Sequence, residues 1–88
     1  MNIKELVEEG NKLNDTIAPD GYGIRYVDNI QFNQWASKCM LYLETEYPNS
    51  IVTEQFKEFY QKKLHKEDIY KSMLGTLNGV EEWEKKQA

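Results

Sequence analysis

The chain has 88 residues, of which 40% are apolar and eleven are aromatic. This length and composition suit a single domain over residues 1–88, and the chain is too short for several domains. The formal net charge is −4, which argues against nucleic-acid binding because affinity for phosphate comes from clustered Lys and Arg. The chain has one cysteine, so no internal disulfide is expected. No apolar run approaches the roughly 20 residues that span a bilayer, so we expect no membrane contact. Because the sequence also shows no secretory-signal pattern, we expect a cytoplasmic protein.

The first segment predicts a helix from about Asn2 to Thr16. Asn2 suits the N-cap position, and Glu5 three residues later completes the pattern of a capping box. Gly10 falls on the apolar side of this helix, and a glycine there is typical of close approach by another backbone. The apolar side is built at helical spacing from Ile3, Leu6, Val7, Leu13 and Ile17.

Turn chemistry follows this helix in Ala18-Pro19-Asp20-Gly21, where proline presets φ and glycine accepts a positive φ. The next residues, 22–27, are too apolar for a free loop and too few for a stable sheet of their own. We therefore expect an extended segment over about residues 18–28 that is laid across the helices.

The second helix is predicted from about Asn29 to Tyr47. Asp28 suits the N-cap with Gln31 as its partner, and Pro48 ends the helix because the residue before a proline avoids the α region. Apolar residues trace a 3.6-residue period, which marks the buried side, at Phe32, Trp35, Ala36, Cys39, Tyr42, Leu43 and Tyr47.

The third helix is predicted to end near Leu64. Ser50 and Thr53 are both plausible caps, so its start stays open between them. Its apolar side is shared by residues that lie three or four apart, namely Val52, Phe56, Phe59 and Tyr60.

The fourth helix is predicted to begin near Lys66. Asn78-Gly79 favours a break, whereas the apolar stripe continues through Val80, and we expect the helix to run on to about Lys85. Four amphipathic helices with short connections predict an all-α fold, a compact four-helix bundle with one extended segment, about residues 18–28, between the first two helices.

Reactive side chains are few. A structural zinc site needs four ligands, and Cys39 and His65 are single residues on different elements, so we expect neither metal nor cofactor. Cys39 lies on the apolar stripe and is expected to be buried and inert, while His65 is expected to be exposed or to cap the fourth helix. The side chains of adjacent acidic residues, such as Glu8-Glu9, point about 100° apart on a helix and do not converge on one substrate. We therefore expect these acids to be solvated charges, and we expect the protein not to be an enzyme.

The candidate partner contact consists of Tyr22, Ile24, Arg25 and Tyr26 in the extended segment. Arg25 is the only arginine in the chain, and Tyr and Arg are enriched at binding hot spots. The alternative is that Ile24 and Tyr26 close the bundle while Arg25 pairs with an acid of the first helix.

Core and turn residues follow one another along the chain in a characteristic order, namely Glu8-Glu9-Gly10, Leu13, Tyr26, Trp35, Lys38, Tyr42-Leu43, Tyr47-Pro48, Phe56, Met73-Leu74, Leu77 and Gly79. This order resembles that of small helical domains in uncharacterised bacterial and phage proteins, some of which stand before a separate effector domain. The resemblance implies an accessory or interaction module and supplies no catalytic residues.

The sequence thus favours a non-enzymatic protein-interaction module that binds a protein partner or forms a homodimer. This hypothesis rests on the lack of a catalytic constellation and on more aromatic residues than four short apolar stripes need. The charge is uneven, since residues 1–20 carry two lysines against five acids and residues 57–71 carry five lysines against three acids. Such asymmetry can guide association, and the alternative is that these charges form solvated helix faces. The alternative is a small acidic phage or mobile-element inhibitor that covers a basic site of a host protein. A small enzyme is a third alternative, which would need a pocket with two titratable groups of shifted pKa.

Overall fold

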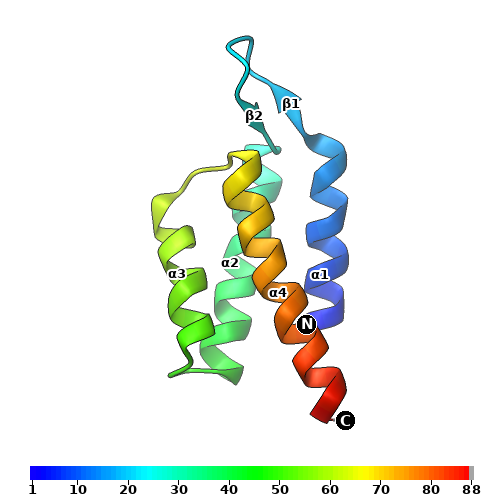
Figure 1. Cartoon of the computed structure of the whole chain (residues 1–88), viewed down its shortest axis with the longest axis vertical. Coiled ribbons are helices and arrows are strands. Elements are labelled where there is room, and N and C mark those ends of the chain that lie inside the picture. Colours follow the sequence, from blue (N-terminus) through cyan, green and yellow to red (C-terminus); the bar gives the residue numbers. More distant parts are fainter. Residues whose placement is uncertain (88) are drawn as a thin grey trace.

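The computed structural model describes residues 1–87 and confirms the predicted all-α, four-helix fold. The helices run alternately up and down, and a short hairpin projects from one end of the bundle (Figure 1). The molecule measures 44 × 22 × 17 Å. The elements in chain order are α1 (Ile3–Lys12), the 3₁₀ turn η1 (Leu13–Thr16), β1 (Ala18–Pro19), β2 (Arg25–Tyr26), α2 (Asn29–Glu46), α3 (Ile51–Lys62) and α4 (Glu67–Gln87).

Side-chain caps fix where three helices begin. The Glu5 amide donates a 2.9 Å hydrogen bond to Asn2 Oδ1, and the Gln31 amide donates a 2.8 Å bond to Asp28 Oδ1. These bonds satisfy backbone donors that a helix start leaves without a partner. At α3 the Val52 amide bonds to Ser50 Oγ at 3.1 Å, which decides the open start of the third helix in favour of Ser50.

The helix ends depart from the prediction in two places. The first helix tightens into a 3₁₀ turn at Leu13, so the predicted span to Thr16 divides into α1 and η1. α3 ends at Lys62 because Lys63 adopts the left-handed conformation with φ 54°. α4 continues through Gly79 to Gln87, as the apolar stripe predicts.

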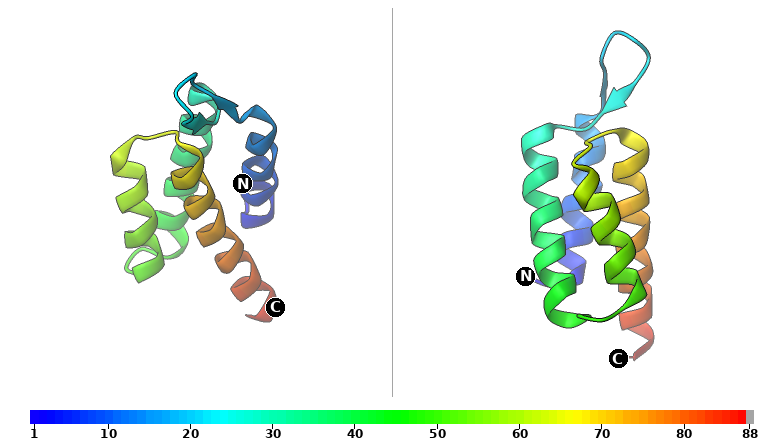
Figure 2. Two further views of the ribbon diagram at one scale, coloured as in Figure 1. Left: turned by 45° about the horizontal axis from the view of Figure 1, so that its top comes forward. Right: turned by 90° about the vertical axis from the view of Figure 1, so that its left-hand side faces the viewer.

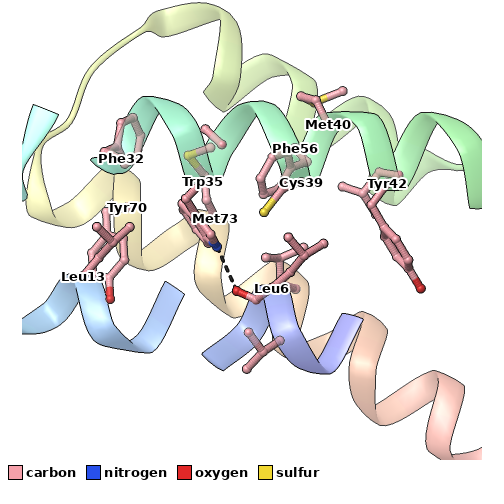
Figure 3. Packing of buried hydrophobic residues seen from close by; sticks show 14 of the residues in the cluster. Leu6, Leu13, Phe32, Trp35, Cys39, Met40, Tyr42, Phe56, Tyr70 and Met73 are labelled. Carbon is pink, nitrogen blue, oxygen red and sulfur yellow. Dashed lines mark hydrogen bonds between the residues drawn. The ribbon is translucent and has the colours of Figure 1, made fainter. Parts of the chain in front are cut away.

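The core lies where the four helices meet. α1 borders α2 and α4, and α3 completes the ring between α2 and α4 (Figure 2). Trp35 of α2 is fully buried at the centre, and its Nε1 donates a 2.9 Å hydrogen bond to the Leu6 carbonyl of α1 (Figure 3). None of the helices within residues 1–87 has the length and apolarity that a bilayer crossing demands.

The connection between α1 and α2 is extended, as expected, but it is not laid across the bundle. Ala18 pairs with Tyr26 and Pro19 with Arg25 in an antiparallel hairpin that rises above the helix ends (Figure 2). A hairpin forms despite its short strands because β2 also bridges to Lys66 on its other side. The expectation that this segment covers the helices is therefore wrong.

Candidate functional site

The tip of the hairpin, residues 20–24, is the part of the molecule that projects furthest beyond the helix ends (Figure 1). Tyr22 stands at this tip with 91% of its surface exposed, and Ile24 is 42% exposed. Single exposed apolar residues are ordinary, but an aromatic ring held this far from the core does nothing for the stability of the fold. The tip is therefore the first candidate for a contact with another molecule.

The backbone of the tip is fixed by its own hydrogen bonds. Asp20 Oδ1 accepts bonds from the Tyr22 amide at 2.7 Å and from the Ile24 amide at 3.3 Å, and the Asp20 amide donates to the Ile24 carbonyl at 2.9 Å. Gly21 and Gly23 have φ of 96° and 89°, a region that other residues enter only with strain. The loop thus presents Tyr22 in a defined position.

The base of the hairpin is anchored to the loop that joins α3 and α4. The rings of Tyr26 and His65 lie 4.8 Å apart, and the Val27 amide donates a 3.0 Å hydrogen bond to the His65 carbonyl. Arg25 Nε lies 3.3 Å from Glu67 Oε1 at the start of α4. The acid that pairs with Arg25 therefore belongs to α4 and not to the first helix, which corrects the alternative drawn from the sequence.

The four candidate contact residues consequently divide into two groups. Tyr22 and Ile24 face solvent at the tip, whereas Tyr26 is half-buried against His65 and Arg25 is engaged by Glu67. The hairpin holds all four residues within one small element, in which Arg25 stays exposed at the surface beside Glu67 and only Tyr26 is partly covered. Arg25 and Tyr26 also join the hairpin to the start of α4 and to the loop before it.

Cys39 and His65 do not form a reactive pair. Cys39 has no exposed surface, and its side chain points into the core (Figure 3). Burial, and secondarily the negative charge of Glu9, raises the pKa of the Cys39 thiol far above its ordinary value. His65 is half-buried by its contact with Tyr26, so the expectation that it is exposed or caps α4 is wrong. Within residues 1–87 no group of three or more His, Cys, Asp or Glu side chains is placed to hold a metal ion.

A second surface, which the sequence did not single out, is a groove of about 520 Å³ between the diverging ends of α3 and α4. It opens because the facing side of α4 carries Gly75, Thr76 and Gly79, whose small side chains leave the helix surface bare. The groove is lined by Val52 and Gln55 of α3 and by Gly75, Thr76, Gly79 and Trp83 of α4. The four-residue spacing of Gly75, Gly79 and Trp83 is visible in the sequence, where the glycines read only as possible helix breakers.

Trp83 is held at the mouth of this groove by a cluster of tyrosines. Its ring packs edge-on against Tyr47 at 5.9 Å, and the hydroxyls of Tyr47 and Tyr42 both donate to Glu84 Oε2, the latter at 2.6 Å. Burial and the carboxylate of Glu84 raise the pKa of Tyr47 to about 12 and raise that of Tyr42 as well. The cluster fixes the last turns of α4 against the end of α2, so that 53% of Trp83 remains exposed on a rigid support.

Both surfaces are apolar, and both are presented by backbone that internal contacts hold in place. Neither brings together a nucleophile, a base and an anion-binding group. Comparisons of the chain with protein-family models, with curated proteins and with solved structures give no match.

Proposed function

We propose that the chain is a non-enzymatic protein-interaction module whose hairpin tip contacts a protein partner. The observation that carries the proposal is the exposure of Tyr22 on a loop that Asp20 and two glycines hold in one conformation. Binding through a preformed loop loses less conformational entropy than binding through a mobile one. Tyrosine is also enriched among the residues that dominate binding energy.

The chemistry of the tip indicates what the partner offers. One oxygen of the Asp20 carboxylate, Oδ1, accepts bonds from two amides, and Arg25 is paired with Glu67. The large apolar groups exposed at the tip are the ring of Tyr22, which carries a hydroxyl, and the aliphatic side chain of Ile24. The complementary surface that we expect is therefore an apolar pocket with a hydrogen-bond acceptor for the phenol.

Site-specific photocrosslinking in the cells that produce the protein tests this proposal. A photoreactive phenylalanine derivative at position 22 is expected to yield a discrete crosslinked species. The same group at Leu41, which is 64% exposed on α2, is the matched control and is expected to yield none. Equal crosslinking at the two positions, or none at either, would contradict a role for the tip.

A substitution separates partner binding from folding. Tyr22→Ala removes the exposed ring and leaves the loop bonds of Asp20 in place, because those bonds involve backbone amides. We expect the partner identified by crosslinking to bind this variant at least tenfold more weakly, with unchanged thermal unfolding. Unaltered affinity would place the contact elsewhere.

The acidic-inhibitor alternative finds less support in the charge distribution. Lys4 and Lys12 are exposed beside Glu5 and Glu8 on α1, so the acids of this helix do not form a face of one sign. A partner bound through a basic site would dissociate steeply as the salt concentration rises. Binding through the tip is expected to depend weakly on salt, and this measurement distinguishes the two functions.

A further inference from the structure

The outward side of α4 is an unpartnered helix face. α4 lies at the front of the molecule in Figure 1, between α1 and α3, and borders the 520 Å³ groove along one edge. Its centre carries Gly75 and Gly79 and its edge carries Trp83. Among the described residues nothing outside the local helix comes within 4 Å of the position that a Cβ would take at either glycine. The fold of one chain therefore leaves this side of the helix open to close approach.

The charges on this face are arranged in a self-complementary order. Asp68 and Lys71 lie toward the start of α4, Glu82 and Lys86 lie toward its end, and all four side chains are exposed. Lys71 also pairs with Glu67 of its own helix, with Nζ 3.3 Å from Oε2. Asp68 stands nine residues before Leu77, and Lys86 stands nine residues after it. Because a helix rises about 1.5 Å per residue, each charge lies about 13 Å from the level of Leu77.

We propose that this face binds a second copy of the chain through antiparallel packing of α4 on α4, centred at the level of Leu77. In that register Gly75 of one copy lies opposite Gly79 of the other, so the two backbones approach closely. Asp68 lies opposite Lys86, and Lys71 lies beside Glu82, each pair occurring twice by two-fold symmetry. A parallel arrangement would instead set Asp68 against Asp68 and Lys86 against Lys86.

The same register accounts for Trp83. Trp83 lies on the edge of the face next to the groove, and in the antiparallel arrangement that edge meets Ser72 and Thr76 of the other copy. Both are small residues, so the exposed ring of Trp83 can lie against the partner's helix there. The four ion pairs at the rim set orientation and register, while backbone contact at the glycines and burial of the Trp83 ring supply the attraction.

Sedimentation velocity over a wide range of protein concentration tests the proposal. The unmodified chain is expected to show a reversible monomer–dimer equilibrium. In Gly79→Leu the added side chain points into open space in the monomer but blocks the close approach of two helices. We therefore expect the dissociation constant of the dimer to rise at least tenfold. The helix content measured by circular dichroism should not change. A chain that stays monomeric at every concentration would overturn the proposal.

Charge reversals test the register itself. Asp68→Lys and Lys86→Glu are each expected to weaken the dimer severalfold, because each places like charges opposite one another. A mixture of the two variants is expected to restore association as a heterodimer, since both pairs of that complex are then attractive. Glu44→Lys, an exposed reversal on α2 across the bundle from α4, is the matched control and is expected to change nothing. Single reversals that dimerise like the unmodified chain would overturn the antiparallel register.

This inference is independent of the hairpin tip. Tyr22→Ala is expected to dimerise like the unmodified chain, and Gly79→Leu is expected to retain crosslinking from position 22 to a protein partner. Loss of dimerisation in Tyr22→Ala would overturn the assignment of the dimer contact to α4, whereas failure of crosslinking at position 22 would leave that assignment standing and count only against the proposed function.

Discussion

The hydroxyl of Tyr70 on α4 donates a 2.5 Å hydrogen bond to the carbonyl oxygen of Gly10 on α1. This bond joins the two helices at the one glycine whose missing side chain the core requires. A Cβ at Gly10 would lie 2.8 Å from Leu74 Cδ1 and 2.8 Å from the ring of Trp35. The prediction that another backbone approaches Gly10 is therefore wrong, because the groups that come close are the indole ring of Trp35 and the side chain of Leu74.

Alanine substitution is expected to change the free energy of unfolding in opposite directions at Gly10 and at a glycine of α4. Gly10→Ala forces Trp35 and Leu74 to shift, and we expect it to lower the free energy of unfolding by roughly 1–3 kcal/mol. Gly75→Ala meets no clash and gains helix propensity, so in dilute protein we expect it to raise that free energy by about 0.5–1 kcal/mol. Urea unfolding of the two variants beside the unmodified chain measures both effects. A stabilised Gly10→Ala would mean that α1 and α4 are further apart than described.

Trp35 is expected to be the most sensitive side chain in the core. It is fully buried, touches the rings of Phe56 and Tyr70 edge-on, and bonds to the Leu6 carbonyl. Trp35→Ala should lower the free energy of unfolding by roughly 3–5 kcal/mol, from lost burial and the cavity that remains. Equilibrium urea unfolding measures this, and Ile30→Ala, which truncates an exposed residue of the same helix, is the matched control. A loss below about 1 kcal/mol at Trp35 would contradict the orientation of α2.

The helices were predictable because their signals are local. The period of the apolar residues in 29–46 and the cap at Asp28 lie within one stretch of chain, and the structure reproduces both. The continuation of α4 through Gly79 followed from the same periodicity. The start of α3 needed the structure, since Ser50 and Thr53 are equally good caps and only the tertiary contact of Thr53 with the Tyr47 carbonyl separates their roles.

The candidate site was only partly predictable because its contacts join distant parts of the chain. The sequence located the segment with Tyr22 and Ile24, but the partner of Arg25 depends on how the start of α4 is placed beside the hairpin. The bonds from Tyr42 and Tyr47 to Glu84 span about forty residues. Such pairings depend on the rotation of one helix relative to another, which no pattern within either helix specifies.

Cys39 is expected to resist modification while the protein is folded. The thiol is fully buried, and its raised pKa leaves almost none of the reactive thiolate at neutral pH. Alkylation then requires the core to open, and an opening free energy of about 3 kcal/mol already slows the reaction roughly a hundredfold. The rate of iodoacetamide labelling, measured by mass spectrometry in buffer and in urea, tests this. Similar rates in the two solvents would show that the thiol is accessible in the native state.

Tyr47 and Tyr42 are expected to make the fold sensitive to alkaline pH. The ordinary tyrosine pKa near 10 applies to the unfolded chain, whereas burial and Glu84 raise the pKa of Tyr47 to about 12 in the fold and raise that of Tyr42 as well. Because the unfolded state releases these protons first, the stabilisation is complete below about pH 10 and is lost as the pH rises toward 12. Urea unfolding across this range should therefore show a steep decline that is shallower in Tyr47→Phe. Tyr22→Phe, which removes a phenol that projects into solvent, is the matched control and should decline as the unmodified chain does. An equally steep decline in Tyr47→Phe would show that the cluster with Glu84 does not hold the end of α4.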